Sequence, residues 1–331
     1  MGAWVFRGAP VIGAAIIMVA ATGCGTAKVA APPQADGATI TVAALPSDDL
    51  AGLYIAQDDG LFAREGLHVT IEKIASSSAV IAAQLKGQVD VGAGSYVPYI
   101  TAQADSARFR ILAEASTLGT DTRVLVITAH SPIKTITDLV GKKIGVNGTN
   151  SIGTLLIGEL LEENGISPDK VDLVTDPAGF PAMPGRLQAG AWSAAFLAEP
   201  YVTIAEEDYG VEVLADLDQG ATSDFPIDGY VVTRAWATDH PAAAAAFVWA
   251  IEQGQTLAET DPGLVEAAIA KSDGLPHEVT SVMALPGFPT GPVDQDRIQR
   301  VADIMLRLGL LSQKYATEVT SGGLVKSLVS S

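Results

Sequence analysis

The chain has 331 residues, enough for two domains of roughly 100–200 residues each, and a formal net charge of −18. Hydrophobic residues make up 48% of it and charged residues only 18%, which excludes the disordered class and predicts a large core. Its acidity argues against binding to DNA or to anionic lipid through bulk charge, so no nucleic-acid partner is expected.

The first 23 residues are predicted to be a signal peptide. Arg7 precedes an uncharged apolar run over residues 8–23, which is shorter than the roughly 20 residues of a membrane-spanning helix. The stretch AATGCG around Cys24, the only cysteine, resembles a bacterial lipobox, although Ala21 stands where leucine is usual. We expect Cys24 to be lipidated and to anchor the protein on the outer face of the bacterial cell membrane, with no disulfide. An ordinary cleaved signal with an incidental cysteine is the alternative.

A tether is predicted over residues 24–38, because small residues and proline dominate there. From Thr39 on, runs rich in Val, Ile and Thr alternate with helical patterns, which indicates an α/β fold with largely parallel sheets. The predicted strands lie at 39–45, 66–74, 89–94, 109–115, 123–129, 142–148, 171–176 and 229–236, with helices at 77–88 and 151–165.

The last third is predicted to be mostly helical, at 239–260, 261–274 and 293–309. Asp239 and Asp261 are expected to cap two of these helices, because each is followed by a proline that suits the first helical turn.

Two stretches of equal length repeat one pattern. LKGQVDVGAGSYVP at 85–98 and LQAGAWSAAFLAEP at 187–200 each run from a helix end through a short strand to a proline. The repetition fits two similar lobes that present strand ends toward one cleft, where open α/β sheets bind ligands.

The turn GTNSIGT at 148–154 comes close to a phosphate-binding P-loop but has Thr154 where that loop needs lysine. Nucleotide hydrolysis is therefore not expected. Two interpretations stay open: an ordinary helix cap, or a cradle in which backbone N–H groups and hydroxyls hold a small ligand.

Catalytic and metal-binding patterns are absent from the sequence. The four histidines are scattered without metal-ligand spacing, and no G-x-S-x-G nucleophile motif occurs. We expect no enzyme activity, no metal and no cofactor. Several polar residues follow predicted strands: Asp48, Glu199 and the serines at 76–78. For each of them two interpretations stay open, a helix cap or a residue that faces a cleft.

Five segments, read in order, resemble one family. They lie at 46–74, 76–98, 131–174, 187–201 and 229–250, and together they resemble solute-binding proteins of ABC importers across about residues 39 to 315. Within this family, the chain resembles the subgroup that contains the nitrate-, sulfonate- and taurine-binding proteins and the binders of thiamine-pyrimidine precursors.

The resemblance implies a type II periplasmic-binding-protein fold, with two α/β lobes joined by two crossing strands as a hinge. The crossings are expected near 123–129 and 229–234, with lobe 1 at 39–125 and 230–331 and lobe 2 at 126–229. A small molecule would bind in the cleft between the closing lobes.

The family's binding positions, carried over by the resemblance, are Ser47, Asp48, Tyr54, Ser76, Ser77, Ser95, Tyr96, Asn150, Ser151, Thr154, Glu199 and Asp228. The family often has G-x-x-D-A before its Glu-Pro, whereas this chain has GAWSAA, with Trp192 or Ser193 in place of the acid. That departure puts the shape of this loop in doubt.

The ligand class is not fixed by the sequence. A sulfonate or nitrate would need donors such as those near Asn150, with Arg123 and Arg186 as the nearest basic residues. A pyrimidine would need acceptors and aromatic rings, and the acidic loops at Asp48 and Glu199 favour such a neutral heterocycle slightly over a sulfonate.

The resemblance therefore implies a monomeric extracytoplasmic lipoprotein that delivers its ligand to an ABC permease and its ATPase. The alternative is a ligand-sensing lipoprotein that docks a membrane receptor or kinase. Relatives that synthesise a thiamine pyrimidine use a cysteine-rich segment, which a chain with one cysteine does not have.

Overall fold

The computed structural model describes residues 1–3, 35, 37–315 and 323–329. Cys24, most of the predicted signal peptide and most of the predicted tether lie outside the described residues. Three residues of the predicted tether nevertheless belong to the first lobe. Ala35 and Gly37 donate backbone hydrogen bonds to Glu65 and Gly66, and Ala38 begins the first strand.

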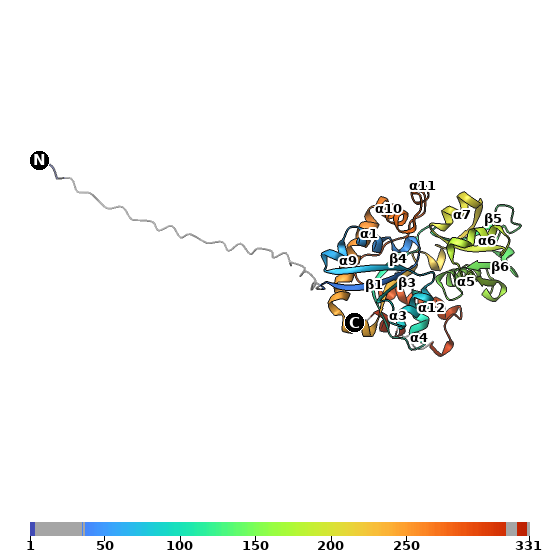
Figure 1. Cartoon of the computed structure of the whole chain (residues 1–331), viewed down its shortest axis with the longest axis horizontal. Helices are drawn as coiled ribbons and strands as arrows, with labels where there is room; N and C mark the ends of the chain where they lie inside the picture. Colours follow the sequence, from blue (N-terminus) through green and yellow to red (C-terminus); the bar gives the residue numbers. More distant parts are fainter. Residues whose placement is uncertain (4–34, 36, 316–322, 330–331) are drawn as a thin grey trace. The chain divides into compact units, whose positions relative to one another are not determined.

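The first lobe is built on a five-stranded mixed sheet. Its order is β2 (Leu67–Lys73), β1 (Ala38–Ala44), β3 (Val91–Ser95), β10 (Pro226–Thr233) and β4 (Phe109–Thr117), and β10 runs antiparallel to both neighbours. One face packs against α1 (Ala51–Asp58), α9 (Pro241–Thr260) and α10 (Pro262–Asp273), as Figure 1 shows. The other face carries α3 (Ser77–Leu85), α4 (Tyr96–Ala104), α12 (Gln295–Arg307) and α14 (Gly323–Val329).

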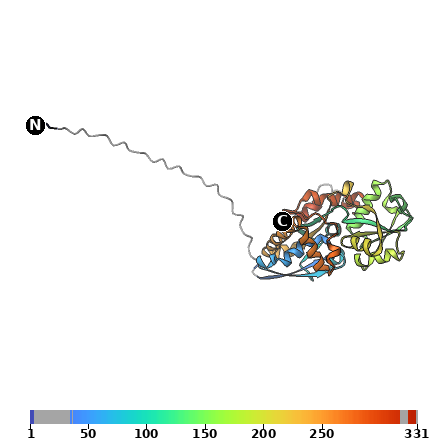
Figure 2. The same ribbon diagram turned by 90° about the horizontal axis from the view of Figure 1, so that it is seen from above.

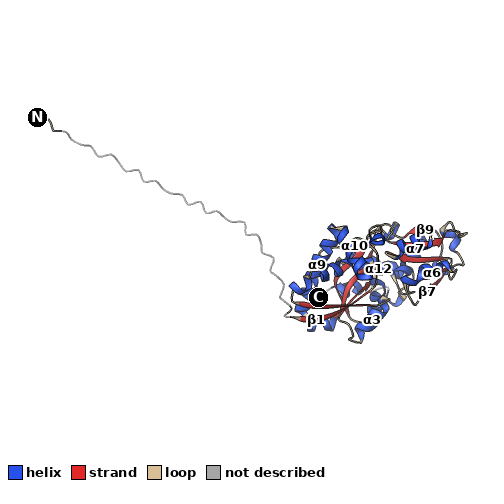
Figure 3. Cartoon of the chain, turned by 45° about the horizontal axis from the view of Figure 1, so that its top comes forward, coloured by secondary structure: helices blue, strands red, loops and turns tan. Residues whose placement is uncertain are grey.

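The second lobe repeats this plan. Its sheet has the order β7 (Asp172–Thr175), β6 (Lys143–Val146), β8 (Ala194–Ala198), β5 (Arg123–Thr128) and β9 (Val211–Asp216). Its helices are α5 (Ile152–Glu163), α6 (Met183–Gln188) and α7 (Tyr201–Tyr209). The strands of the two sheets form two separate groups in Figures 2 and 3. The predicted two-sheet α/β architecture is confirmed, but the prediction of largely parallel sheets is wrong. Each sheet is mixed, because β10 in one and β5 in the other run antiparallel to both neighbours.

Short elements complete the fold. They are α2 (Leu61–Arg64), α8 (Arg234–Asp239) and α11 (His277–Thr280), with 3₁₀ turns at Asp48–Leu50, Ile136–Leu139, Pro168–Lys170, Phe180–Ala182, Gly220–Thr222 and Gln313–Tyr315. Within the described residues, no helix has both the length and the apolar character to cross a bilayer.

Two segments connect the lobes, residues 118–122 after β4 and residues 217–225 after β9. They touch each other, because Leu118 donates a backbone hydrogen bond of 2.8 Å to Phe225. The predicted boundaries at 125/126 and 229/230 therefore fall inside β5 and β10. An apolar run in the sequence shows that a strand exists but not which sheet it joins.

The C-terminal helices are not confined to lobe 1, where the sequence placed them. Arg307 of α12 pairs with Glu159 and Glu162 of α5 in lobe 2. Arg300 of the same helix donates to backbone carbonyls of the second connection. Helix α12 thus contacts both lobes and their connection.

Most predicted elements are present, but strand β9 and helices α4 and α14 are among those that were not predicted. Asp239 does not cap a helix: it ends α8, while Pro241 opens α9. Asp261 does cap α10, accepting a bond of 3.1 Å from the Gly263 amide.

The repeated sequence pattern has a structural counterpart. Helices α3 and α6 end in the same pair of backbone bonds, closed by glycines in the left-handed region, Gly87 at φ +68° and Gly190 at φ +78°. Each then leads into the central strand of its sheet, β3 or β8.

Candidate functional site

An uncharged cavity of about 260 Å³ lies between the lobes, and we call it the donor cavity. Lobe 1 contributes Ser76–Ser78 at the start of α3, and lobe 2 contributes Asn147–Ser151 and Thr175 at the ends of β6 and β7. Every side chain that lines it is a hydroxyl or an amide, apart from Gly148. The cavity can therefore offer many hydrogen-bond donors and no formal charge.

The lobe 1 wall is the first turn of α3. Ser76 caps this helix, its Oγ accepting a bond of 3.3 Å from the Ala79 amide. The Oγ of buried Ser77 accepts a bond of 3.0 Å from the Ser95 amide on β3. Both hydroxyls act as acceptors in these bonds, which leaves their protons for a ligand.

The lobe 2 wall is the turn that leads into α5. Ser151 occupies the N-cap position, but its side chain does not cap the helix. Its Oγ donates to the Gly148 carbonyl at 2.6 Å, and Thr154 Oγ1 donates to the same carbonyl at 3.2 Å. The turn is thereby fixed while the first amides of α5 have no side-chain cap. Such amides, with the helix dipole behind them, attract an anion.

Asn150 and Asn147 mark the two sides of the lobe 2 turn. The Asn150 side-chain oxygen lies 3.3 Å from the Thr101 hydroxyl of α4, a direct contact between the lobes. The side-chain oxygen of Asn147, Oδ1, is buried and has no hydrogen-bond partner within the described residues.

A second cavity of about 200 Å³ adjoins the first, and we call it the apolar cavity. Phe180, in its wall, packs between Phe196 and Tyr201, with ring centroids 5.8 and 6.1 Å away. The lining is Leu45, Pro46, Lys73, Ile74 and Ala75 from lobe 1 and Ala178–Pro181 from lobe 2.

Asp176 holds the lobe 2 side of the apolar cavity in place. Its Oδ1 accepts a bond of 2.9 Å from the Ala178 amide, and its Oδ2 lies 3.2 Å from Nε of Arg186. Arg186, one of two basic residues considered as anion ligands, is thus engaged in positioning this turn.

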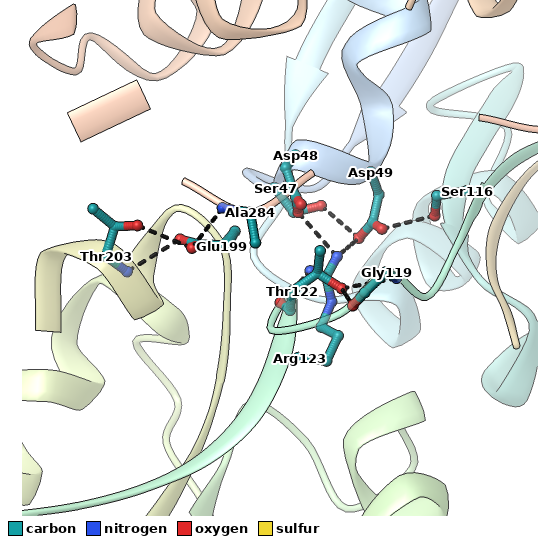
Figure 4. A network of polar contacts seen from close by, with 10 residues as sticks. All are labelled: Ser47, Asp48, Asp49, Ser116, Gly119, Thr122, Arg123, Glu199, Thr203 and Ala284. Atoms are coloured by element: carbon teal, nitrogen blue, oxygen red, sulfur yellow. Dashed lines mark hydrogen bonds and ion pairs between the residues drawn. The ribbon is translucent and has the colours of Figure 1, made fainter. Parts of the chain in front are cut away.

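The acidic loop of lobe 1 forms a buried charge cluster with the other basic residue, Arg123 (Figure 4). The guanidinium of Arg123 contacts Asp48 at 3.0 Å and also contacts Asp49. Asp49 accepts further bonds from Ser47 at 2.9 Å and Ser116 at 2.7 Å. Arg123 is the first residue of β5, so the cluster joins lobe 1 to the sheet of lobe 2.

Burial dominates the titration of this cluster. It raises the pKa of Asp48 well above the ordinary range, while Arg123 acts in the opposite direction. Burial and then the charge of Asp49 raise the pKa of Asp228 on β10. Asp48 is paired with Arg123, and Asp228 is buried close enough to the cluster for the charges of Asp49 and Arg123 to act on its pKa.

Glu199 makes an equally complete set of bonds. Its Oε1 accepts from the Thr203 hydroxyl at 2.9 Å and from the Ala284 amide at 3.1 Å, and its Oε2 accepts from the Thr203 amide at 3.1 Å. Burial raises the pKa of Glu199. The bond to Ala284 ties lobe 2 to a segment that pairs with β4 at Thr117.

The structure brings some predicted residues together and separates others. Ser76, Ser77, Asn150 and Ser151 line the donor cavity, with Thr154 directly behind them. Ser47, Asp48 and Asp228 belong to the charge cluster. Tyr54 lines a different cavity beside α10, while Ser95, Tyr96 and Glu199 line neither interlobe cavity.

Sequence reasoning missed several lining residues, among them Asn147, Thr175, Lys73 and Ala178, whereas Phe180 was among the aromatic residues considered for a heterocyclic ligand. Asn147 and Thr175 mark the carboxyl ends of neighbouring parallel strands, which is the signal that could have found them. Trp192 in the doubtful loop packs into the core against Gly145, where a Cβ would approach its ring to 2.4 Å. In the part of the chain that the structure describes, no group of His, Cys, Asp and Glu is suited to a metal ion.

Comparison with known proteins gives consistent results. The sequence model of the family described as NMT1/THI5 like matches residues 47–264. A putative aliphatic sulfonates-binding protein of Escherichia coli (strain K12) is 27% identical over 194 residues, and the chain spans 58% of the length of that relative and 58% of its own.

Two solved structures are similar in fold. One is the alkanesulfonate-binding protein SsuA from Xanthomonas axonopodis pv. citri bound to MOPS, with TM-score 0.71, 18% identity and coverage of 86% of this chain and 96% of that one. The other is the periplasmic nitrate-binding protein NrtA from Synechocystis PCC 6803, with TM-score 0.69, 16% identity and coverage of 88% and 91%. The predicted two-lobe binding-protein fold is confirmed.

Proposed function

The chain belongs to the NMT1/THI5-like family, and from this premise we propose that it is an extracytoplasmic solute-binding lipoprotein for small sulfonates. It captures a sulfonate between its lobes and delivers it to an ABC permease and its ATPase. Cys24 carries the lipid that holds it at the cell membrane.

The observation that carries the proposal is the pair of helix starts that face one cavity. Helix α3 from lobe 1 and helix α5 from lobe 2 both begin at the donor cavity. An anion placed there would receive hydroxyl and amide donors from both lobes and the favourable ends of two helix dipoles. A ligand held from both sides stabilises the closed arrangement of the lobes.

The charge distribution favours a sulfonate over a pyrimidine. The acidic residues that made a heterocycle attractive at the sequence level do not line the donor cavity. Glu199 is bonded to Thr203 and Ala284, and Asp48 pairs with Arg123 through Oδ1, while its buried Oδ2 has no partner within the described residues. What remains in the cleft is a neutral set of donors. The named sulfonate-binding relative supports the same class.

A thermal-shift screen tests the proposal. The full chain, in mild detergent, is heated with alkanesulfonates, taurine, nitrate, hydroxymethylpyrimidine and carboxylates of matched size. A ligand at a hundredfold excess over its dissociation constant stabilises the native state by about 2.7 kcal/mol, or several degrees. We expect a shift with at least one sulfonate, reduced in Ser151→Ala and retained in Ser281→Ala, an exposed serine directly after α11.

A shift with a pyrimidine and none with any sulfonate would overturn the ligand class. No shift with any compound would overturn the small-molecule function and favour a protein that docks a membrane receptor.

A further inference from the structure

We propose that this protein prefers sulfonates that carry a ring-sized apolar group, as arylsulfonates do, and that the apolar cavity holds this group. The proposal rests on the sulfonate-binding function given above. It adds the chemical class of the rest of the ligand, and it assigns Ile74 as a specificity residue outside the donor cavity.

The two cavities are placed to hold two parts of one molecule. On lobe 1, residues 73–75 line the apolar cavity and the next three residues, 76–78, line the donor cavity. On lobe 2, Thr175 lines the donor cavity and residues 178–181 line the apolar cavity. A Cβ on Gly179 would lie 3.7 Å from the Ala75 carbonyl oxygen, so the lobes approach each other at this junction. A sulfonate held at the helix starts can extend its substituent into the apolar cavity.

The lining of the apolar cavity suits an apolar group. Eight of its nine lining residues have no polar atom in their side chains. The ninth, Lys73, pairs through its ammonium with Asp273 and donates to the Ser272 carbonyl, so its charge is compensated within lobe 1. Moving an apolar group from water to such a lining is favourable in proportion to the area that is buried.

The size of the apolar cavity fits one ring. Its volume is about 200 Å³. A cavity of about 150 Å³ that is lined by Leu, Ile and Phe binds benzene. A methyl group would contact only part of the wall and would gain little dispersion energy. A ring fills the space without rotatable bonds, so it loses less conformational freedom on binding than an alkyl chain of similar size.

The walls of the apolar cavity include rings from both lobes. Pro46 comes from lobe 1, and Phe180 and Pro181 come from lobe 2. Phe180 is held in place, because its ring centroid lies 5.8 Å from that of Phe196 and 6.1 Å from that of Tyr201. Aromatic rings attract each other at centroid distances of about 4.5–7 Å, so an aryl group in this cavity would gain contact with a preformed wall.

Three sulfonates test the proposal by calorimetry on the full chain in mild detergent. Benzenesulfonate, propane-1-sulfonate and methanesulfonate share the head group and differ in the apolar substituent. We expect benzenesulfonate to bind at least about tenfold more tightly than methanesulfonate, with propane-1-sulfonate between them, because each buried CH₂ group raises the affinity about fourfold. Equal affinities for benzenesulfonate and methanesulfonate would overturn the proposal. Tighter binding of propane-1-sulfonate than of benzenesulfonate would overturn the preference for a ring.

Two isoleucine variants locate the cause. Ile74→Ala removes part of the wall and should lower the ratio of benzenesulfonate to methanesulfonate affinity about threefold or more. Ile71→Ala is the matched control: Ile71 is also half-buried and lies on β2, but it lines the cavity beside α10. It should leave the ratio within about twofold. The affinity for methanesulfonate shows in each variant whether the donor cavity is intact.

The outcomes separate the two proposals. If none of the three sulfonates binds, the proposed function and this inference fall together. If all three bind with equal affinity, only the inference falls. An affinity ratio that changes in neither variant, or equally in both, would overturn the assignment to Ile74.

Discussion

Two turns hold corresponding places in the lobes, yet their side chains differ in kind. Strands β1 and β6 are each second in their sheets, and each leads through a turn into a helix. The turn after β1 carries Asp48 and Asp49, both buried and bonded to Arg123. The turn after β6 carries Asn147 to Ser151, without a charge.

This difference separates two tasks. A buried charge has to be paired within the protein, so the lobe 1 turn is committed to joining the lobes. Neutral hydroxyls and amides are satisfied by water until a ligand replaces it, so the lobe 2 turn stays available. The same position in the fold serves the hinge in one lobe and the ligand in the other.

The largest effect is expected from removing the cation of the charge cluster. Arg123→Met leaves Asp48 and Asp49 buried without their partner and should reduce the free energy of unfolding by about 3–5 kcal/mol. Urea denaturation followed by circular dichroism measures it. Lys134→Met is the control, because its pair with Glu212 is exposed and 3.8 Å long, and a change below about 1 kcal/mol is expected. Equal losses in both variants would contradict the role of the cluster.

The next effect comes from making the lobe 2 turn acidic, like its lobe 1 counterpart. Asn150→Asp places a carboxylate in the donor cavity, and the affinity for propane-1-sulfonate should fall by about tenfold or more. Asn164→Asp, the same change at the far end of α5, should alter the affinity by less than about twofold. Unchanged binding in Asn150→Asp would place the sulfonate elsewhere.

Local sequence patterns left two interpretations open for the lobe 2 turn and for Ser76 and Ser77, a helix cap or a ligand cradle. The fold places these residues at the interlobe cavity, although Ser76 also caps α3. Periodicity predicted most of the strands and the helices α3, α5, α9, α10 and α12.

The partners of the acidic residues could not be predicted. The position of Asp48 in the cluster depends on Arg123, which is 75 residues away in the chain. Likewise, Glu199 is bonded to Ala284 from a segment 85 residues later. A carboxylate that follows a strand has the same local pattern whether it faces a ligand or a buried guanidinium, and only the fold decides between them.

A smaller effect concerns pH. Burial raises the pKa of Asp48 and Asp228 above the ordinary value of 3.8, so between that value and the raised one the folded state binds more protons than the unfolded state. The free energy of unfolding should therefore rise as the pH falls through the raised pKa toward 3.8, and decrease as the pH increases again.

Asp228→Asn removes one of these groups and should make the pH dependence shallower, by up to about 1.4 kcal/mol per pH unit in the range where Asp228 titrates. Urea denaturation at pH 7, 6 and 5 measures the slope, with the exposed Asp172→Asn as control. A slope that does not change in Asp228→Asn would show that Asp228 does not carry the raised pKa.

The smallest effect is expected at Glu199. The family resemblance predicts that this residue contacts the ligand, whereas its hydrogen bonds indicate a structural role. Glu199→Gln keeps one oxygen acceptor of the same shape but puts an NH₂ group where the second oxygen accepts, so we expect a loss of about 1 kcal/mol in the free energy of unfolding. Glu199 lines neither interlobe cavity, so the affinity for propane-1-sulfonate should stay within about twofold.

A tenfold or larger loss of affinity, with stability unchanged, would instead assign Glu199 to the ligand. The division between a charged hinge and a neutral binding turn would then no longer hold, because an acidic residue would share both tasks.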